Sequence, residues 1–346
     1  MKIGIVGCGA IAKNRQAPEF FANPDCEIGG FYDVDPARSA ALAAQYGGEA
    51  FASLGAMLAD AGIDSVSICS ANRFHCEQTL AALAAGKNVL CEKPMAMTEE
   101  EGEKMVAAAK ASGKKMMVAQ SQRYDPAHMR AKEILESGAL GRVVSFRTEF
   151  GHSGPEAWAG YKEGKLFWYF DPAGAGYGAL GDIGVHKADL VRWLTGEEVA
   201  EVSAFTATTD KKACGRPIPV EDNAAVCLRM ANGIVGTMQL SWTQYGRDAN
   251  STVICCEKGQ IRLYCRPDEA MEVIHADGRC EVFPIKEIWD SYGRHNSGII
   301  DAFVACVVHD TPVPVTAEDG LAAVRVIEAC KRSSQENRAV RLKGVK

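Results

Sequence analysis

The chain opens with Lys2-Ile3-Gly4-Ile5-Val6-Gly7-Cys8-Gly9-Ala10-Ile11-Ala12. Its apolar first half predicts a buried strand over Lys2–Val6, and the small residues after it fit the G-x-G-x-x-A form of a dinucleotide-binding turn. The first glycine of such a turn makes the tight bend, the second lets the backbone approach a pyrophosphate, and the third small residue lets a helix pack on the strand. We therefore predict that a dinucleotide binds at Gly7, Gly9, Ala10 and Ile11, on the N-terminus of the next helix.

A second predicted strand, Glu27–Tyr32, ends at Asp33. This acid follows the glycines at close to the roughly 20-residue spacing of the residue that holds the ribose hydroxyls. A carboxylate there repels a 2′-phosphate, so NAD is favoured over NADP as the cofactor. Two alternatives stay open: Asp33 as an ordinary turn residue, and Arg38 as a partner for a 2′-phosphate.

Strands and helices go on alternating as far as residue 121. Further strands are predicted at 65–69, 89–91 and 115–119, and Thr98-x-x-Glu101 is a capping box that begins one of the helices between them. Pro18 is expected to break or kink the first helix, because proline has no backbone N–H. About six strands in alternation with helices predict a doubly wound parallel sheet over residues 1–121.

Two of these strands end in polar stretches. The strand at 65–69 runs into Ser70-Ala71-Asn72-Arg73-Phe74-His75, and the strand at 89–91 runs into Glu92-Lys93-Pro94. Ligands of open α/β sheets bind beyond the carboxyl ends of the strands, so Lys93 is expected where a cofactor and a substrate meet. A solvated turn is the plain alternative, because lysine is mostly an exposed residue.

The alternation changes after residue 121, and a second domain is predicted over 122–346. A helix at 126–137 and a long strand over Val143–Gly151 are followed by three hairpins, whose turns are Ala231-Asn232-Gly233, Glu257-Lys258-Gly259 and Asp277-Gly278. Helices at 298–309 and 317–333 end the region. The fold class is therefore α/β, with a second α+β domain built on a large, open, mostly antiparallel sheet. Ala225 and Cys227 place apolar residues on the outer face of one strand, which suggests that a second subunit covers it.

Two features of the second domain suggest chemistry. The segment 154–180 is long, irregular and rich in aromatic residues, which indicates function or mobility. Its aromatic faces suit the C–H side of a sugar ring, although Phe167 and Phe170 are expected to fill a core. Downstream, Asp182, His186 and Asp189 share one face if the segment is helical, and an acid one turn before a histidine orients it and raises its basicity. A helix with solvated charges is the alternative.

Composition excludes several classes of protein. The 346 residues are 47% hydrophobic and 24% charged with a net charge of −6, so a large core and no nucleic-acid partner are expected. No apolar run approaches the roughly 18–20 residues of a membrane span, and the first strand shows no signal-peptide pattern. The 13 cysteines include no Cys-x-x-Cys pair. Those in apolar runs, such as Cys69, Cys227 and Cys306, are expected to be reduced and buried in a cytoplasmic protein without a metal site.

Taken together, these residues resemble the Gfo/Idh/MocA oxidoreductases, a family that includes inositol dehydrogenases. The resemblance covers nearly the whole chain and is carried by Gly7–Ala12, Asp33, Glu92-Lys93-Pro94, Arg123 with Pro126, the Gly-rich run from 176 to 189, and the ending with Pro312-x-Pro314, Glu318-Asp319-Gly320 and Ser333. Glu-Lys-Pro combined with the Asp182 and His186 run is specific, whereas either alone is not. Ser70-Ala71-Asn72 departs from the Thr-Pro-Asn that many members carry, but it keeps Asn72 and His75.

The resemblance implies an N-terminal Rossmann domain and hydride transfer between NAD and a secondary alcohol of a sugar, cyclitol or sugar derivative. It implies a homodimer or homotetramer through the C-terminal sheet. The site residues that it implies fall into three groups. Catalysis is expected from Lys93, Asp182 and His186. The cofactor is expected to contact the turn residues above with Asp33, Ser70, Asn72, His75, Glu92 and Lys93. The substrate is expected to contact Arg123, Tyr124, Trp168 and Tyr169.

Three other functions stay open at this point. The first is a glycosidase with tightly bound NAD, which oxidises, eliminates, hydrates and reduces on the same fold. The second is a non-enzymatic nicotinamide sensor, against which Lys93 and His186 argue, because a sensor needs no base. The third is a reductase of another small-molecule class, because fold alone does not determine function.

Overall fold

The computed structural model describes residues 1–161, 167–285 and 296–345. The chain divides into two compact units, each of which is described by itself. The first contains Met1–Ser121, Trp158–Gly160 and the described part of Ile288–Leu321; the remaining residues form the second. The described residues 296–321 lie with the first unit, although they fall within the predicted second domain, 122–346.

The first unit is built on a parallel six-stranded sheet in the order β3-β2-β1-β4-β5-β6. The strands are β1 (Lys2–Val6), β2 (Glu27–Tyr32), β3 (Glu49–Ala50), β4 (Ser65–Ile68), β5 (Asn88–Cys91) and β6 (Met116–Val118). The strand order reverses between β1 and β4, and ligands of such sheets bind beyond the carboxyl ends of the strands at this switch point. The predicted doubly wound parallel sheet is confirmed, although the short β3 was not predicted.

Three of the six helices described in the first unit, α2, α3 and α5, begin at side-chain caps, which are Asp35, Ser53 and Thr98. They are α1 (Ala17–Ala22), α2 (Pro36–Tyr46), α3 (Leu54–Ala59), α4 (His75–Ala84), α5 (Glu99–Ser112) and α9 (Ile299–Val308). The predicted capping box is confirmed, because Thr98 Oγ1 accepts from the Glu101 N–H (3.2 Å) and the Glu101 carboxylate accepts from the N–H of Met97 (2.9 Å). Before α1 the chain forms a π-turn, η1 (Ala12–Gln16), so the helix around Pro18 is irregular as expected.

Residues 296–321 cover the otherwise open side of β6. The Val118 N–H donates to the carbonyl of Val315 (3.1 Å), and the Lys115 ammonium lies 2.8 Å from the Asp310 carboxylate. A strand at the edge of a sheet exposes unpaired N–H groups, and this segment satisfies one of them. The C-terminal region therefore completes the first unit.

The second unit is built on a mixed nine-stranded sheet in the order β16-β15-β14-β13-β7-β12-β11-β8-β17. The strands are β7 (Val143–Gly151), β8 (Val199–Ala207), β11 (Asn223–Met230), β12 (Val235–Ser241), β13 (Thr252–Cys256), β14 (Gly259–Arg266), β15 (Glu269–His275), β16 (Cys280–Phe283) and β17 (Val340–Arg341). Only β7 and β12 pair in parallel, so the sheet is mostly antiparallel as predicted. The three predicted hairpins are present, whereas β8, β17 and the small hairpin of β9 (Lys212–Ala213) and β10 (Arg216–Pro217) were not predicted.

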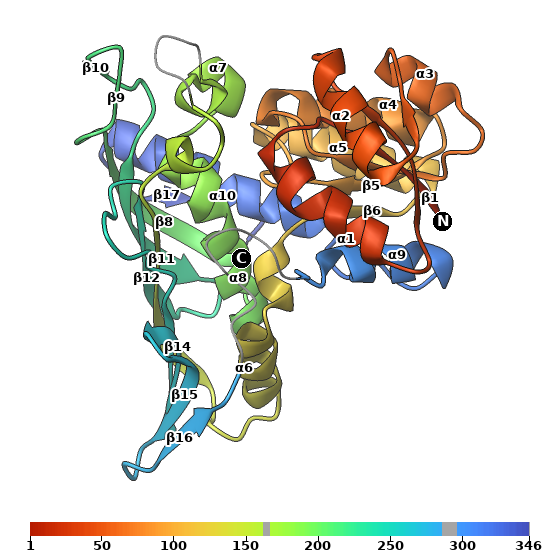
Figure 1. Cartoon of the computed structure of the whole chain (residues 1–346). Coiled ribbons are helices and arrows are strands. Elements are labelled where there is room, and N and C mark those ends of the chain that lie inside the picture. Colours follow the sequence, from red (N-terminus) through yellow and green to blue (C-terminus); the bar gives the residue numbers. More distant parts are fainter. Residues whose placement is uncertain (162–166, 286–295, 346) are drawn as a thin grey trace. The chain divides into compact units, whose positions relative to one another are not determined.

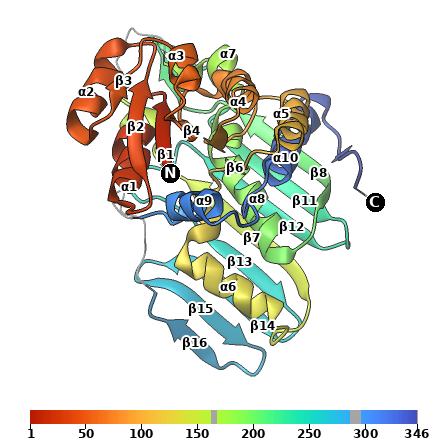
Figure 2. The ribbon, with the colours of Figure 1, turned by 90° about the vertical axis from the view of Figure 1, so that its right-hand side faces the viewer.

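Helices cover one face of this sheet. Figures 1 and 2 show α6 (Pro126–Glu136) and α8 (Val185–Thr195) on the same side, with α6 lying across β13 and β14. On β11, Val226 and Leu228 are buried on that side, whereas Ala225 and Cys227 are exposed on the other. The expectation that Cys227 is buried was therefore wrong, because successive residues of a strand face opposite sides of its sheet. Cys69 and Cys306 are buried as expected.

The described residues show neither a membrane-spanning helix nor a metal-binding cluster. None of their helices is long and apolar enough to cross a membrane. Among the same residues, no group of three or more His, Cys, Asp or Glu side chains is arranged to hold a metal ion.

Gly178 packs closely against Glu221 shortly before the start of α8. Its N–H donates to a carboxylate oxygen of Glu221 (2.8 Å), and a Cβ on Gly178 would lie 1.8 Å from the Glu221 carbonyl oxygen. We expect Gly178→Ala to lower the free energy of unfolding by about 3 kcal/mol, because the backbone must move apart. Urea unfolding followed by circular dichroism measures this.

Gly55→Ala is the matched control, because its Cβ would lie 3.8 Å from the nearest atom, the Ser53 Oγ. It is expected to add roughly 0.5–1 kcal/mol of helix stability. Equal effects of the two substitutions would contradict this account of Gly178.

Candidate active site

The dinucleotide turn of the first unit has the backbone that its sequence predicts. Gly7 has φ +88°, and a Cβ on it would lie 2.6 Å from the backbone nitrogen of Ser70. A Cβ on Gly9, by contrast, would meet no atom within 4 Å. The backbone is therefore closely packed at Gly7, whereas the space next to Gly9 is open. This arrangement lets a pyrophosphate lie against the backbone of the turn.

The Asp33 carboxylate lies at the carboxyl end of β2 and is held by backbone donors. One oxygen accepts from the N–H of Cys8 (2.7 Å) and the other from the N–H of Asp35 (2.8 Å). Asp33 is thus a turn residue that also braces the dinucleotide turn at Cys8. Its position beside Cys8 suits a carboxylate that accepts from ribose hydroxyls.

The other predicted cofactor residues lie at the carboxyl ends of β4 and β5. The His75 ring is buried, and its two nitrogens lie 2.8 Å from the carbonyl of Pro94 and 2.9 Å from the carbonyl of Ser70. Burial lowers the pKa of His75, which favours the neutral ring. His75 therefore lies between the two strand-end loops, and the half-buried Lys93 belongs to the loop after β5.

Glu92 and Asn72 are buried at the same edge. The Glu92 carboxylate faces Arg15 and Gln16 inside the unit. No role was predicted for Arg15 or Gln16. The sequence feature that could have indicated a role is the pair Arg15-Gln16 in the first helix, directly after the predicted dinucleotide turn.

In the second unit, Asp182 lies in a π-turn, η6 (Leu180–Gly184), that leads directly into α8. One Asp182 oxygen accepts from the Trp242 indole N–H (3.1 Å) and lies 3.7 Å from His152 Nε2. The ring centroid of His186 lies 6.0 Å from that of Phe150. Asp182 is thus hydrogen-bonded to the residue directly after β12 and lies close to the residue directly after β7. π-turns in helices occur frequently at functional sites.

His152 is a site residue that the sequence analysis left without a role. Its Nδ1 accepts a hydrogen bond from the Gly154 N–H (3.0 Å), so the proton of the neutral ring is on Nε2, which faces Asp182. The available signal was its position directly after β7, at a strand end. Helical spacing could not have paired His152 with Asp182, because the two residues lie in different elements and are brought together only by the fold.

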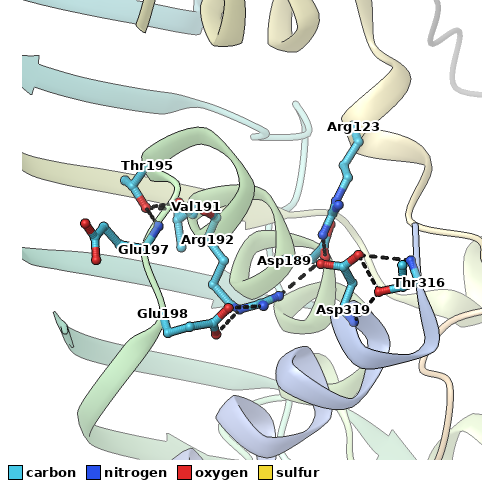
Figure 3. Close-up of polar contacts among 9 residues, drawn as sticks. All are labelled: Arg123, Asp189, Val191, Arg192, Thr195, Glu197, Glu198, Thr316 and Asp319. Atoms are coloured by element: carbon cyan, nitrogen blue, oxygen red, sulfur yellow. Dashed lines mark hydrogen bonds and ion pairs between the residues drawn. The ribbon is translucent and has the colours of Figure 1, made fainter. Parts of the chain in front are cut away.

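Arg123 was predicted to bind substrate. Its Nε and Nη2 donate to the two carboxylate oxygens of Asp189 at 2.7 and 2.6 Å, and both side chains are buried (Figure 3). Arg192 lies 3.8 Å from the same carboxylate and donates to Glu198 through two nitrogens. Asp189 therefore binds arginines, whereas Asp182 binds Trp242, so the two acids serve different contacts.

The aromatic segment divides into a buried and a half-buried part. Phe167 and Phe170 are buried with ring centroids 5.0 Å apart, which confirms that they fill a core. Trp168 and Tyr169 are stacked at 3.8 Å and are half-buried, and Tyr124 is half-buried as well. Their predicted contact with substrate stays a prediction. His295, considered as a substrate contact, lies outside the described residues.

A buried cation lies next to His186 in sequence. Lys187 is fully buried, its ammonium lies 3.3 Å from both the Asn250 carbonyl and Thr252 Oγ1, and the Phe150 ring lies 5.7 Å from it. Burial lowers the pKa of Lys187 to about 7. This ammonium is directed into the unit and anchors α8 to β13.

The open dinucleotide turn, the parallel sheet and the polar strand ends define a dinucleotide-binding protein with a Rossmann domain. Two family models match the chain: "Oxidoreductase family, NAD-binding Rossmann fold" over residues 1–120, and "GFO/IDH/MocA C-terminal domain" over residues 128–262. The chain belongs to the Gfo/Idh/MocA oxidoreductase family, and its first unit is an NAD-binding domain.

Individual relatives agree with this assignment. Levoglucosan dehydrogenase of Pseudarthrobacter phenanthrenivorans is 32% identical over 276 residues, 72% of this chain and 69% of that protein. Inositol 2-dehydrogenase 2 of Saccharopolyspora erythraea is 27% identical over 96% of this chain and 93% of its own. The solved structure of levoglucosan dehydrogenase with NADH and levoglucosan matches with a TM-score of 0.86 at 28% identity, over 99% of each chain. This protein is an NAD(P)-dependent oxidoreductase.

Lys187 makes the stability of the second unit depend on pH. Between pH 7 and 10.5 the unfolded chain binds a proton at Lys187 that the folded chain does not, so stability falls as the pH falls through this range. We expect the free energy of unfolding of Lys187→Met, relative to the wild type, to rise by roughly 3 kcal/mol from pH 10 to pH 7. Urea titrations at several pH values measure this difference.

Lys13→Met is the control, since Lys13 is exposed. Its difference from the wild type is expected to be flat across the same range. A flat difference for Lys187→Met would show that the buried ammonium carries no such cost.

Proposed function

We propose that this enzyme reversibly oxidises a secondary alcohol of a sugar, cyclitol or sugar derivative with NAD. The observation that carries the proposal is the hydrogen-bonded Asp182 at the start of the helix that carries His186. Its support is the substrates named for the relatives, which are levoglucosan, inositol and, for a 28% identical protein of Escherichia coli, a D-glucoside.

The proposed mechanism assigns one task to each side chain. His186 takes the proton of the substrate hydroxyl as a general base. Lys93 donates to the same oxygen and stabilises its developing negative charge. Bound NAD supplies the nicotinamide carbon that accepts the hydride. Asp182, held by Trp242 and close to His152, accepts from a neighbouring hydroxyl and so orients the sugar ring.

The cofactor preference follows from Asp33. Its carboxylate is braced by two backbone N–H groups beside the dinucleotide turn, which suits ribose hydroxyls and repels a 2′-phosphate. NAD is therefore the proposed cofactor and NADP the weaker one. Formation of reduced cofactor from polyols, sugars and nucleotide-sugars, each tested with NAD and with NADP, decides both substrate class and preference.

That panel also separates the rival functions. Net reduction of added NAD supports a dehydrogenase. Turnover of glycosides with copurifying NAD that is not consumed would indicate the glycosidase cycle instead. Binding of NAD without turnover of any substrate would favour a sensor and would contradict the proposal.

We expect Lys93→Met and His186→Ala each to lower kcat by about 10²–10⁴-fold, because each removes a group that acts on the reacting oxygen. NAD affinity is expected to change little in His186→Ala. Steady-state kinetics and fluorescence titration with NAD measure the two quantities. Lys104→Met and His309→Ala, at exposed positions, are the matched controls and should retain full turnover.

We also propose a cytoplasmic homodimer or homotetramer that assembles through the outer face of the large sheet. Phe205 on β8 is 73% exposed and pairs with Ala225 on β11, whose neighbour on the same face is the exposed Cys227. An apolar group of this kind on an uncovered sheet face is typical of a subunit interface.

Phe205→Arg tests the assembly. The charge is expected to prevent burial of this face and to reduce the mass in solution to that of one chain, measured by light scattering after size exclusion. Phe21→Arg, at an exposed phenylalanine of the first unit (61%), should leave the mass unchanged. An unchanged mass for both variants would place the interface elsewhere.

A further inference from the structure

Glu221 binds the backbone that leads into the π-turn of Asp182. One oxygen of its carboxylate accepts from the N–H groups of Gly178 (2.8 Å) and Leu180 (3.0 Å). Its own carbonyl accepts from the N–H of Ala179 (2.9 Å). Three consecutive residues are therefore bound to a single residue from a distant part of the chain.

This contact caps a helical segment that lacks a cap of its own. η6 and α8 form one continuous segment over residues 180–195, and the residue before it is Ala179, whose methyl group cannot accept a hydrogen bond. The first N–H groups of a helix have no partner inside it, and a carboxylate is favoured at that end. Glu221 supplies the missing acceptor from 41 residues beyond Leu180.

A further backbone hydrogen bond carries the cap to Asp182. The Asp182 N–H donates to the carbonyl of Gly178 (3.0 Å), the residue whose own N–H is bound by Glu221. A Cβ on Gly178 would overlap the Glu221 carbonyl oxygen, so the two backbones are in direct contact. The place of Asp182 therefore depends on the place of Glu221.

The residue after Glu221 holds the partner of the Asp182 side chain. The carbonyl of the buried Asp222 accepts from the backbone N–H of Trp242 (2.7 Å), and the Trp242 indole N–H donates to Asp182 (3.1 Å). The backbone of Asp182 is thus bound by way of Glu221, and its carboxylate by way of Asp222. Two neighbours directly before β11 determine both.

The helix beyond Asp182 is anchored by other groups. Asp189 binds arginine side chains, and Lys187 binds the carbonyl and hydroxyl groups near the start of β13. These anchors lie on either side of α8 residues close to His186. Loss of the Glu221 cap is therefore expected to displace Asp182 more than His186.

We propose that Glu221 is a positioning residue that determines, through the backbone of residues 178–180, where the Asp182 carboxylate meets the substrate. The proposal rests on the role proposed for Asp182, which is to orient the sugar ring. The cap requires an acceptor oxygen at a defined distance rather than a charge, because its donors are neutral N–H groups. Burial raises the pKa of the Glu221 carboxyl, so its surroundings do not favour the charged form.

The first test compares Glu221→Gln with Glu221→Asp. Glutamine keeps the acceptor oxygen at the same reach without the charge, whereas aspartate keeps the charge and withdraws the oxygen by one methylene. With saturating NAD and the substrate identified by the panel of polyols and sugars, we expect Glu221→Gln to keep KM within about twofold of the wild type. We expect Glu221→Asp to raise KM about tenfold and to change kcat less than about threefold, because Asp182 holds a non-reacting hydroxyl. Equal KM values, or the reverse order, would overturn the proposal.

A double-mutant cycle tests whether Glu221 acts through Asp182. In an Asp182→Ala background the carboxylate is absent, so Glu221→Asp is expected to raise KM by less than about twofold. The same rise as in the wild-type background would show that Glu221 acts on another group and would contradict the proposal.

The Trp242 indole N–H provides a readout that needs no substrate. The chain has five tryptophans, and Trp242→Phe identifies the signal of this indole in nitrogen–proton NMR spectra. Glu221→Asp is expected to shift the signal toward that of an indole without a hydrogen bond, whereas Glu221→Gln is expected to leave it in place. An unchanged signal in Glu221→Asp would overturn the proposal.

Glu19→Asp is the matched control for withdrawal of a half-buried carboxylate. In the first unit, Glu19 accepts from the N–H (3.1 Å) and the hydroxyl (2.7 Å) of Ser297, and burial raises its pKa as well. Its substitution is expected to lower the melting temperature without a shift of the Trp242 signal. A shift of equal size would show that loss of stability alone explains the effect.

Failure of the proposed function and failure of this proposal are distinguishable. If the wild type reduces no NAD with any member of the panel, the proposed function fails, while the Trp242 signal still decides whether Glu221 places Asp182. If Glu221→Asp does not fold, Gly178→Ala separates the same backbones. It is expected to shift the Trp242 signal in the same direction, and an unchanged signal would contradict the proposal.

Discussion

The first unit depends on the requirement that a buried carboxylate be compensated by buried donors. Glu92 meets this requirement through Arg15 and Gln16, which belong to the helix after the dinucleotide turn. Such a pair adds little net stability compared with apolar packing, but leaving one partner alone is costly. The pair therefore favours one arrangement, in which the helix after the turn is held in a fixed position against the end of β5.

The second unit meets a related requirement with different groups. Asp182 is held by the Trp242 indole N–H and lies close to His152. Asp189 is held by Arg123 through both carboxylate oxygens, and Arg192 lies 3.8 Å from one of them. Each acid of the Asp182–Asp189 segment is thus assigned to its own contact. These contacts of Asp182 and Asp189 fix the π-turn that leads into α8 and the middle of α8. The helix can therefore hold the His186 side chain in one orientation, which a general base requires.

Much of the fold could be read from local patterns. The strands Glu27–Tyr32, Val143–Gly151 and Asn223–Met230 were predicted with the bounds that the structure has, because apolar runs and alternation register burial residue by residue. The strand Val199–Ala207 was missed although it alternates in part, and Cys227 was expected to be buried although its strand turns it outward. The partners of Val199–Ala207 are not visible in that segment alone, whereas the alternation within its own strand already turns Cys227 outward.

The sequence by itself determined the dinucleotide turn, the parallel first sheet, the family and the identity of Lys93, Asp182 and His186 as candidates, because each depends on residues that are neighbours along the chain. Only the tertiary structure decided that Glu92 faces Arg15, that His75 joins two loops, that Arg123 binds Asp189 and that His152 faces Asp182. These contacts join residues from different elements, and their partners are selected by the packing of strands and helices in space. Periodicity along a chain carries no information about that choice.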